Sequence, residues 1–440
     1  MTRRQLLSLT GCPTASAALG WGQSSPREIA PDADITVRIG EVTVELAPGR
    51  SVKTVAYNGQ APGPVLRATE GKPLVVDVWN DTAESEMVHW HGFHIPSDVD
   101  GAHEEGTPHI PAHDHRRYTF TPNPPGTRWY HSHGHAGRNL HRTTYSGEFG
   151  LFIVEPKNAP GRYDLEIPIV LHEWDPYFTE DMDVAYKLFS INGKMLGGGE
   201  PIRARQSQRV LFRVLNASAT LTHRLALPGH RFNVIALDGN AIAPARSVPV
   251  LELGPAERVD ALVEMDYPGV WILGETRDAQ RRAGMGIVVE YAGAQGPPRW
   301  ASPEPFTWDY TMFGGNKTAA EPDGKFTLVI RERSGHKWTI NGKSFPHTDP
   351  ILVKANRRYR LIFANQSAEA HPMHLHRHRF EITRFAGKPT SDVSKDTVLV
   401  PPWREVEVDV LTSNPGPTLL HCHQQLHMDS GFMAMMQYSD

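Results

Sequence analysis

Short segments in which apolar and polar residues alternate recur along the whole chain of 440 residues. Examples are "ITVRIGEVTVEL" from Ile35, "KPLVVDVWN" from Lys72, "QRVLFRVLN" from Gln208 and "EVEVDVL" from Glu405. A period of two places neighbouring side chains on opposite faces of a β-strand, and the 38 glycines and 36 prolines supply turns between such strands. Helical periodicity is weak throughout, so the pattern predicts an all-β protein.

A long internal repeat divides these strands into groups. Segments that begin at Asn58, Asn192 and Asn341 each open with Asn-Gly, pass through a strand that follows a proline, and end with a strand that closes on Asn. Their starts are separated by about the length of one domain, which predicts three related β-sandwich domains. We place these at residues 30–157, 158–305 and 306–440, after an N-terminal tail at 1–29, with 292–305 as a linker.

The N-terminus resembles an export signal. Arg3-Arg4 precede a short apolar run and small residues, as in a twin-arginine signal, and this predicts a periplasmic or secreted protein. The alternatives are a lipoprotein cleavage box at "LTGC" and a disordered tail. Removal of the leader would also remove Cys12, one of two cysteines, and leave Cys422 as the single thiol.

Charge and hydropathy exclude several classes of partner. The net charge is -4 and no run of like charges stands out, so we expect neither nucleic acid nor an anionic membrane as a partner. No apolar stretch after the leader approaches the roughly 20 residues of a transmembrane helix, so we expect no membrane insertion.

The 23 histidines are clustered. Four segments contain His-x-His pairs: "HWHG" (His89, His91), "HSHGH" (His131, His133), "HPMHLHRH" (His371, His374, His376) and "HCH" (His421, His423). Residues i and i+2 of a strand project from one face, so each pair offers two imidazoles on the same side. One pair could be ordinary surface or core histidines, but four pairs in the first and third repeats indicate shared metal ions.

The single thiol narrows the choice of metal. Structural zinc sites use several cysteines, whereas imidazoles with one thiolate suit copper in a trigonal His₂Cys site. Cys422 and His427 can supply two such ligands, with His371 as the third. If Cys422 faces one side of its strand, its neighbours His421 and His423 face the other side and bind a separate cluster.

These four segments, in this order, resemble the ligand motifs of the multicopper oxidases, the family of laccases and bacterial copper-tolerance oxidases. The resemblance spans the chain from about residue 35 to its end and implies three cupredoxin-like Greek-key domains, the middle one without copper. It also implies four copper ions: one type 1, one type 2 and two type 3. By motif position the resemblance makes His371, Cys422 and His427 the type 1 ligands, His89 and His374 the type 2 ligands, and His91, His131, His133, His376, His421 and His423 the type 3 ligands.

The resemblance implies a laccase-type oxidase. Such an enzyme takes single electrons from phenols or aromatic amines at the type 1 copper and uses four of them to reduce dioxygen to water. The alternative is a metallo-oxidase that oxidises Cu(I) or Fe(II) in copper tolerance. We expect a monomer whose partners are dioxygen and a small aromatic or metal-ion reductant. Three rivals fit the residues less well: a nitrite reductase needs two such domains, an electron carrier needs only the type 1 ligands, and a non-catalytic scaffold would have lost ligands.

Several positions depart from the family pattern. The family often has an axial methionine five residues after the last histidine, but this chain has Phe432 there, as many laccases do. Met433, one position later, is expected to face away from the copper. A three-coordinate type 1 copper is therefore predicted. Many bacterial members carry a proton-passing glutamate between "HCH" and the last histidine, whereas this chain has Gln424, Gln425 and Leu426. Asp100 matches the family aspartate after the first motif and is the candidate catalytic proton donor. Its alternative role is that of a turn residue before glycine.

The remaining thirteen histidines lie outside the motifs, seven of them between His94 and His141. We interpret these as a solvated, hydrogen-bonded set, with an auxiliary copper site or a substrate-entry surface as the alternative. The methionines in "GFMAMMQ" alternate along an expected core strand and are interpreted as packing residues.

Overall fold

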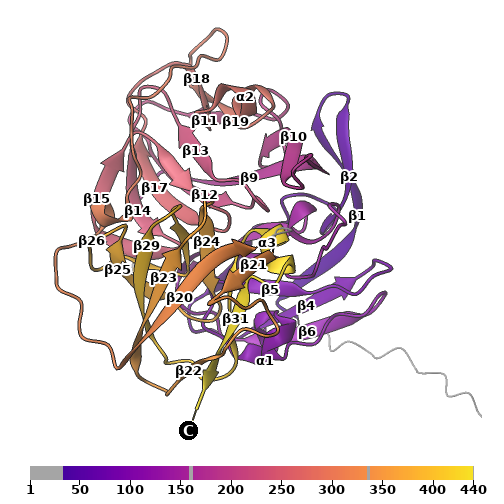
Figure 1. The fold of residues 1–440 in the computed structure, drawn as a ribbon. Coiled ribbons are helices and arrows are strands. Elements are labelled where there is room, and N and C mark those ends of the chain that lie inside the picture. The colour runs from indigo at the N-terminus through magenta and orange to yellow at the C-terminus, as the bar shows by residue number, and fades with distance from the viewer. Residues whose placement is uncertain (1–32, 158–161, 334–336, 440) are drawn as a thin grey trace, which may run out of the picture.

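A computed structural model describes residues 33–157, 162–333 and 337–439 of the chain. Within this part the strands form six sheets that stack in three pairs (Figure 1). The segment with the paired arginines lies outside the described residues. The prediction of an all-β protein built from three sandwiches is confirmed.

The first pair of sheets is formed by residues before 157. One sheet has the strand order β2-β1-β4-β6 and the other β3-β8-β7-β5. Their bounds are β1 Ile35–Ala47, β2 Arg50–Tyr57, β3 Leu66–Thr69, β4 Leu74–Asn80, β5 Val88–His91, β6 His115–Phe120, β7 Gly126–Ser132 and β8 Phe149–Glu155. The strand β5 is therefore an edge of its sheet.

The second pair follows the same plan with longer sheets. The orders are β10-β9-β12-β17-β14-β15 and β11-β19-β18-β13-β16. Their bounds are β9 Leu165–Phe178, β10 Val184–Ile191, β11 Ile202–Ala204, β12 Arg209–Asn216, β13 His223–Ala226, β14 Phe232–Leu237, β15 Asn240–Val248, β16 Leu251–Leu253, β17 Arg258–Glu264, β18 Val270–Glu275 and β19 Gly286–Tyr291.

The third pair has the orders β21-β20-β23-β29-β25-β26, with β27 paired to β25, and β22-β31-β30-β24-β28. Their bounds are β20 Gly324–Arg333, β21 Lys337–Ile340, β22 Ile351–Val353, β23 Arg358–Asn365, β24 His371–Leu375, β25 Phe380–Phe385, β26 Lys388–Pro389, β27 Ser394–Lys395, β28 Thr397–Val400, β29 Glu405–Leu411, β30 Thr418–Cys422 and β31 Met433–Tyr438.

Helices are few and short. They are α1 Ser97–Asp100, α2 Asp278–Arg282, α3 Gln425–Asp429 and the 3-10 turns η1 His103–Glu105, η2 Thr143–Tyr145 and η3 Tyr310–Phe313. Among the described residues, no helix has the length and apolar character needed to cross a membrane.

The recurring Asn-Gly segments have one structural role. Asn58, Asn192 and Asn341 all have left-handed backbones, with φ of 51°, 53° and 52°. In each case the side-chain oxygen accepts a hydrogen bond from a backbone N–H in the first strand of that sandwich. The side-chain NH₂ group donates to a backbone carbonyl in the same strand, two residues before that N–H. Asparagine tolerates this backbone and supplies both bonds, so the segment ties a hairpin to its sandwich.

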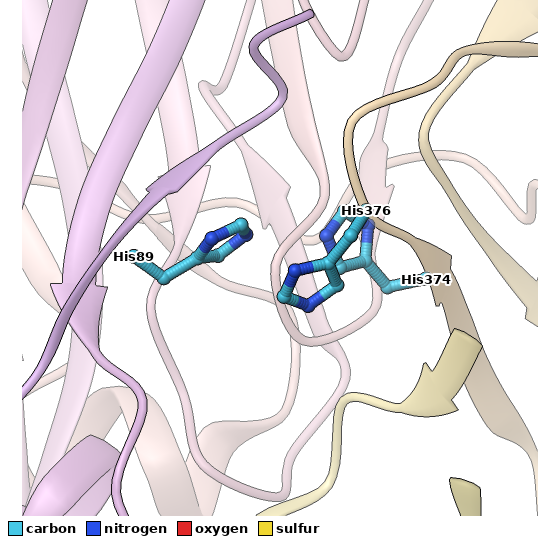
Figure 2. A group of neighbouring side chains, drawn as sticks. All are labelled: His89, His374 and His376. Carbon is cyan, nitrogen blue, oxygen red and sulfur yellow. The ribbon is translucent and has the colours of Figure 1, made fainter. Parts of the chain in front are cut away.

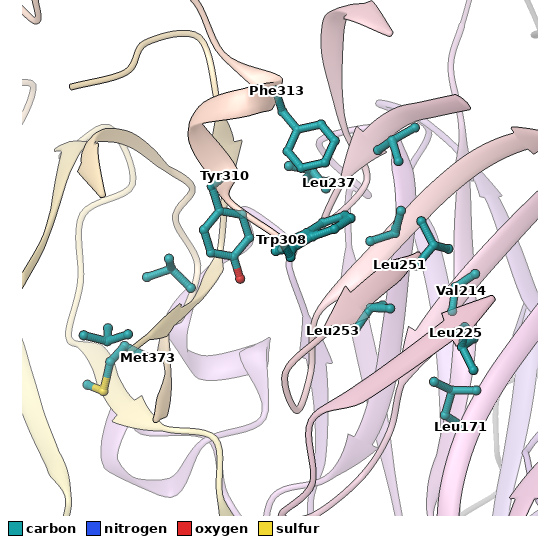
Figure 3. Packing of buried hydrophobic residues seen from close by; sticks show 14 of the residues in the cluster. Leu171, Val214, Leu225, Leu237, Leu251, Leu253, Trp308, Tyr310, Phe313 and Met373 are labelled. Atoms are coloured by element: carbon teal, nitrogen blue, oxygen red, sulfur yellow. The ribbon is translucent and has the colours of Figure 1, made fainter. Parts of the chain in front are cut away.

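The cores of the three sandwiches are connected. Buried residues of the second and third pairs form one hydrophobic cluster, and Trp308, Tyr310 and Phe313 of the connecting segment lie between them (Figure 3). A smaller cluster joins the first pair to the second, for example through Trp129 and Trp174. This packing holds the first and third sandwiches in place for the side chains described next.

Candidate metal centre

Four strand ends from the first and third sandwiches bring the histidine pairs together. In the first, β5 pairs with β7 so that His89 is opposite His131. In the third, β24 pairs with β30 so that His374 is opposite His421. Side chains directly opposite each other in an antiparallel pair share a face, so each sheet presents its histidines as one layer.

The two layers face each other across the junction of the sandwiches. His89, from the first sandwich, points toward His374 and His376, from the third, and all three are buried (Figure 2). One ring nitrogen from each lies within 4.8 Å of the others. The rings of His89 and His376 are stacked with centroids 4.0 Å apart. A metal ion at this place could be held by both sandwiches.

Two further groups of three rings flank these residues. His133, His376 and His421 form one group, in which Nε2 of His421 lies 3.0 Å from Nε2 of His376 and 3.5 Å from that of His133. His91, His131 and His423 form the other, with ring centroids 5.0 to 5.6 Å apart. Thus all eight histidines of the two layers that sequence reasoning assigned to the cluster are brought together.

Hydrogen bonds fix the direction in which these rings point. The Nδ1–H groups of four rings donate to backbone carbonyls at 2.8 to 2.9 Å: those of His89, His131, His374 and His421. For the first three, Nε2 is buried without a hydrogen-bond partner among the described residues. A buried nitrogen without a partner costs free energy unless something binds it, so these atoms fit metal ligands.

Most of these rings are also kept neutral. Burial, followed by the nearby imidazoles, lowers the pKa of most of these histidines well below the usual value, and that of His421 to about 4. The rings with this shift are His91, His131, His133, His374, His376 and His423. Neutral imidazole is the form that binds a metal ion, so the layers are suited to hold several cations side by side.

A second candidate site surrounds the thiol. Sγ of Cys422 lies 3.5 Å from Nδ1 of His427 and 3.8 Å from Nδ1 of His371, and all three side chains are buried. Burial raises the pKa of the Cys422 thiol, so a cation is needed to stabilise the thiolate here. One sulfur and two imidazole nitrogens at one point suit copper.

Aromatic residues enclose this second site. The ring of Phe432 lies 5.1 Å from that of His371 and is buried. The indole of Trp338 contacts both imidazoles, with centroids 4.4 Å from His371 and 4.4 Å from His427. Met433 pairs with His421 in the sheet, so it lies on the face opposite to Cys422, as expected. Sequence reasoning did not identify Trp338, which lies in a strand distant from every motif.

Two carboxyl groups lie beside the histidine layers. Asp100 Oδ2 is 2.9 Å from Nδ1 of His376 and 3.2 Å from Nδ1 of His89. Glu105 Oε1 is 3.7 Å from Nδ1 of His376 and accepts a hydrogen bond from the backbone N–H of Leu419 at 2.6 Å. Burial and the charge of Asp100 raise the pKa of Glu105. Asp100 thus touches the candidate site, and Glu105 joins it from η1, where the sequence carries no motif.

At the thiol site, one buried imidazole has a partly exposed neighbour. Nε2 of His427 lies 3.4 Å from Oε2 of Glu369, a side chain that is 41 % exposed. Glu369 thus gives the buried His427 ring a partly exposed, acidic neighbour.

The histidines outside the motifs have separate contacts. His103 and His109 are exposed neighbours with ring centroids 5.0 Å apart, and His115 stacks on Trp79 at 4.6 Å. His135 pairs with Asp429 at 3.1 Å and is largely exposed. These four are solvated as predicted, but His172, His230 and His378 are buried, so the prediction of a solvated set does not hold for every described histidine outside the motifs.

The second sandwich differs at the matching position. His223 begins β13 and pairs with the last residue of β16, as His371 begins β24 and pairs with the last residue of β28. However, both ring nitrogens of His223 contact carboxylates, those of Glu173 and Glu275. Burial opposes its positive charge, but these two carboxylates raise the pKa of His223 to about 9. An imidazolium whose two ring nitrogens both donate hydrogen bonds has no free lone pair with which to bind a metal ion.

Comparisons with known proteins agree with this geometry. Sequence models of multicopper oxidase domains match residues 38–159, 179–291 and 317–440. The multicopper oxidase MmcO of Mycobacterium tuberculosis is 30% identical, over 89% of this chain and 84% of the relative. A laccase of Pycnoporus cinnabarinus is 26% identical, over 93% of this chain and 90% of the relative.

A solved structure shows the same fold. That of Fet3p, a multicopper oxidase described as functioning in iron import, has a TM-score of 0.79 at 18% identity and covers 92% of this chain and 90% of its own. The three sandwiches are therefore cupredoxin-like domains. The chain's buried, neutral histidines also suit copper. This chain belongs to the multicopper oxidase family, whose members are copper-binding oxidoreductases that use dioxygen.

Proposed function

We propose that the protein is a laccase-type oxidase. It removes single electrons from phenols or aromatic amines at a type 1 copper and reduces dioxygen to water with four electrons at a cluster of three coppers. The observation that carries the proposal is the separation of the donors into a thiol site and a histidine cluster that share strand β30.

The assignment of donors follows the observed groups. His371, Cys422 and His427 hold the type 1 copper, and His89 and His374 hold the type 2 copper. The groups His91–His131–His423 and His133–His376–His421 hold the two type 3 coppers. Copper supplies one-electron redox chemistry at each site, for a total of four stored electrons per dioxygen.

The protein's own side chains supply the route and the protons. The His427 side chain, 7 % exposed, lies beside the partly exposed Glu369, so this edge is the contact for the reductant. Cys422 is covalently linked to His421 and His423, so few bonds separate the two sites. Asp100, buried against His89 and His376, can orient water and pass protons to the cluster.

Oxidation of Cu(I) or Fe(II) is the second candidate function. The half-exposed carboxylate of Glu369 beside His427 favours it, because a carboxylate attracts cations and is a good oxygen ligand for them. A neutral phenol gains less from the same charge.

The chain organisation and location complete the proposal. The three domains occupy residues 30–157, 158–305 and 306–440, with the second free of copper. The N-terminal 1–29 segment directs export to the periplasm or medium, where the enzyme acts as a monomer. Mass analysis of the exported protein and its sedimentation behaviour test these points.

Oxygen uptake tests the function itself. Copper-loaded protein is supplied with phenols, aromatic amines, Cu(I) and Fe(II) in turn, while bound copper per chain is measured. We expect four coppers per chain, an intense blue absorption, and oxygen consumption driven by phenols. One copper per chain without oxygen uptake would instead indicate an electron carrier.

A further inference from the structure

The side chain and backbone of one residue, Asp396, reach two histidines of the cluster. Its Oδ1 lies 3.1 Å from Nε2 of His91, and its backbone carbonyl accepts a hydrogen bond from Nδ1–H of His374 at 2.8 Å. The two imidazoles are stacked, with centroids 3.7 Å apart and an interplanar angle of 14°. Asp396 therefore connects a histidine of the first sandwich with one of the third.

Asp396 is itself held by the second sandwich. Arg258, in β17, donates from Nη1 to Oδ1 at 2.7 Å and from Nη2 to Oδ2 at 2.5 Å. Asp238, in the turn after β14, accepts hydrogen bonds from the backbone N–H groups of Asp396 and Thr397 at 3.2 and 3.1 Å. Arg258 is fully buried and Asp396 nearly so, and a two-bond contact between guanidinium and carboxylate fixes direction as well as distance.

The ion pair packs tightly against the first copper motif. Gly92 follows His91 and has a φ of +87°. A Cβ atom there would lie 2.7 Å from Nη2 of Arg258 and 2.8 Å from Oδ2 of Asp396. The glycine of "HWHG" is thus required for two reasons: its φ is positive, and a side chain would collide with the ion pair. The three sandwiches are therefore closely packed at this point.

The hydrogen bonds of His91 are the reverse of those of four other rings in the layers. His89, His131, His374 and His421 use Nδ1 toward a carbonyl. In His91, Nε2 contacts Asp396, and Nδ1 is the buried nitrogen without a hydrogen-bond partner in the described part of the chain. Because a carboxylate held by arginine accepts but does not donate, Nε2 carries the hydrogen and Nδ1 keeps its lone pair.

We propose that Asp396, clamped by Arg258, is a positioning residue that presents Nδ1 of His91 to the cluster and keeps this ring aligned with His374. The second sandwich, which supplies no metal ligand in our assignment, thereby contributes Arg258 to the assembly of the cluster. The inference rests on the proposed function, because it assumes that the histidine layers bind copper.

Copper release tests this role separately from turnover. Copper-loaded wild type, Asp396→Ala, Asp396→Asn, Arg258→Gln and Arg258→Lys are exposed to a chelator, and the release of copper is followed together with the blue absorption. Loss of outer contacts of this kind weakens metal affinity about 10- to 100-fold, so we expect cluster copper to leave faster by that factor in Asp396→Ala and Arg258→Gln. The blue absorption persists, because within the described part of the chain Asp396 makes no hydrogen bond to His371, Cys422 or His427. Arg258→Lys keeps the positive charge but cannot make the two-bond contact with the carboxylate. Its copper release should therefore be intermediate between wild type and Arg258→Gln.

Arg213→Gln is the matched control. Arg213 is a buried arginine of the same sandwich that contacts Asp260 at 3.0 Å and Thr127 at 2.8 Å, and it binds no histidine. Thermal unfolding of each copper-free variant shows whether the substitution has destabilised the fold as a whole.

The outcomes separate the two proposals. Wild-type release rates in both Asp396 variants, or equal acceleration by Arg213→Gln, would overturn the positioning role while leaving the oxidase intact. A wild-type protein that binds no copper would instead overturn the proposed function. Should Asp396→Ala fail to fold, the asparagine and lysine variants still decide the question.

Discussion

The side chains of Cys422 and His421, adjacent in β30, belong to different candidate sites. Sγ of Cys422 is 3.5 Å from Nδ1 of His427, whereas Nε2 of His421 is 3.0 Å from Nε2 of His376. A strand places neighbours on opposite faces, so one peptide unit separates the two environments. This relationship explains why the chain keeps its single internal thiol between two histidines.

Substitution of the thiol separates the two sites. Cys422→Ser removes the thiolate but leaves the histidine layers, so we expect loss of the blue colour and of substrate oxidation while cluster copper remains. Absorption spectra and copper content of the purified variant measure this. Met433→Leu, on the opposite face of the neighbouring strand, is the control. A serine variant that stays blue and active would disprove the assignment.

If the thiol site holds the proposed type 1 copper, Phe432 should influence its reduction potential. Phe432 is buried beside His371 and stacks with Trp338, whose ring centroid is 5.7 Å away. A thioether donor stabilises the oxidised copper more than the reduced one, so Phe432→Met should lower the type 1 potential. Redox titration of the blue band measures the shift. An unchanged or raised potential, with the methionine located at the copper, would refute this view of the axial electronics.

Much of the fold was predictable because local sequence determines it. Alternating segments became strands, and the recurring Asn-Gly segments became equivalent hairpin ties through Asn58, Asn192 and Asn341. The strand order and the continuous core between the second and third sandwiches depend on contacts distant in sequence, as for Trp308. No period in the sequence reports those contacts.

The grouping of the candidate ligands was predictable to the extent that they occur in pairs. The His-x-His spacing identified the histidines, since a strand converts this spacing into one face. Asp396, Glu105 and Trp338 were missed because each is a single residue that reaches the site from a different element. A buried carboxylate such as that of Asp396, which directly precedes β28, has no sequence signal of its own.

Asp100 is expected to matter for reoxidation rather than for copper binding. Its carboxylate contacts His376 and His89, and its Oδ1 is buried without a hydrogen-bond partner among the described residues. An amide keeps the shape but does not cycle protons, so Asp100→Asn should retain copper and rapid reduction of the blue site. General acid–base groups contribute about 10²- to 10⁴-fold, so reoxidation by oxygen should slow within that range. Stopped-flow reoxidation measures it, and wild-type rates would leave Asp100 a turn residue.

A buried carboxyl in the first sandwich should make stability depend on pH. Burial, opposed in part by Arg142, raises the pKa of Glu86 from 4.5 to about 7. The folded state therefore binds this proton more tightly than the unfolded state. The resulting stability is complete below pH 4.5 and is lost as the pH rises through about 7, an effect on the order of 3 kcal/mol.

Unfolding of the copper-free protein tests the role of Glu86. We expect the free energy of unfolding to decline between about pH 4.5 and pH 7, and Glu86→Gln to flatten that decline. Glu41→Gln, on the exposed surface of the same sandwich, should leave the slope unchanged. Equal slopes in wild type and Glu86→Gln would show that another group titrates.

The carboxylate beside His427 can distinguish the two candidate classes of reductant. Glu369 Oε2 lies 3.4 Å from Nε2 of His427 and is partly exposed, so its charge acts on whatever approaches this edge. Glu369→Gln keeps the size and removes the charge. A divalent cation loses an attractive interaction, and a tenfold fall in kcat/KM for Fe(II) corresponds to about 1.4 kcal/mol, within reach of one partly screened charge. For a neutral phenol, kcat/KM should change by less than about threefold, since little Coulomb energy is involved.

Steady-state oxygen uptake with both reductants, at low and high salt, measures this difference in kcat/KM. Glu405→Gln on β29 provides an exposed control. The fall for Fe(II) should shrink at high salt because ions screen exposed charges. Equal losses for phenol and Fe(II) would show that Glu369 acts by orienting His427, and the charge would then no longer favour a metal-ion reductant.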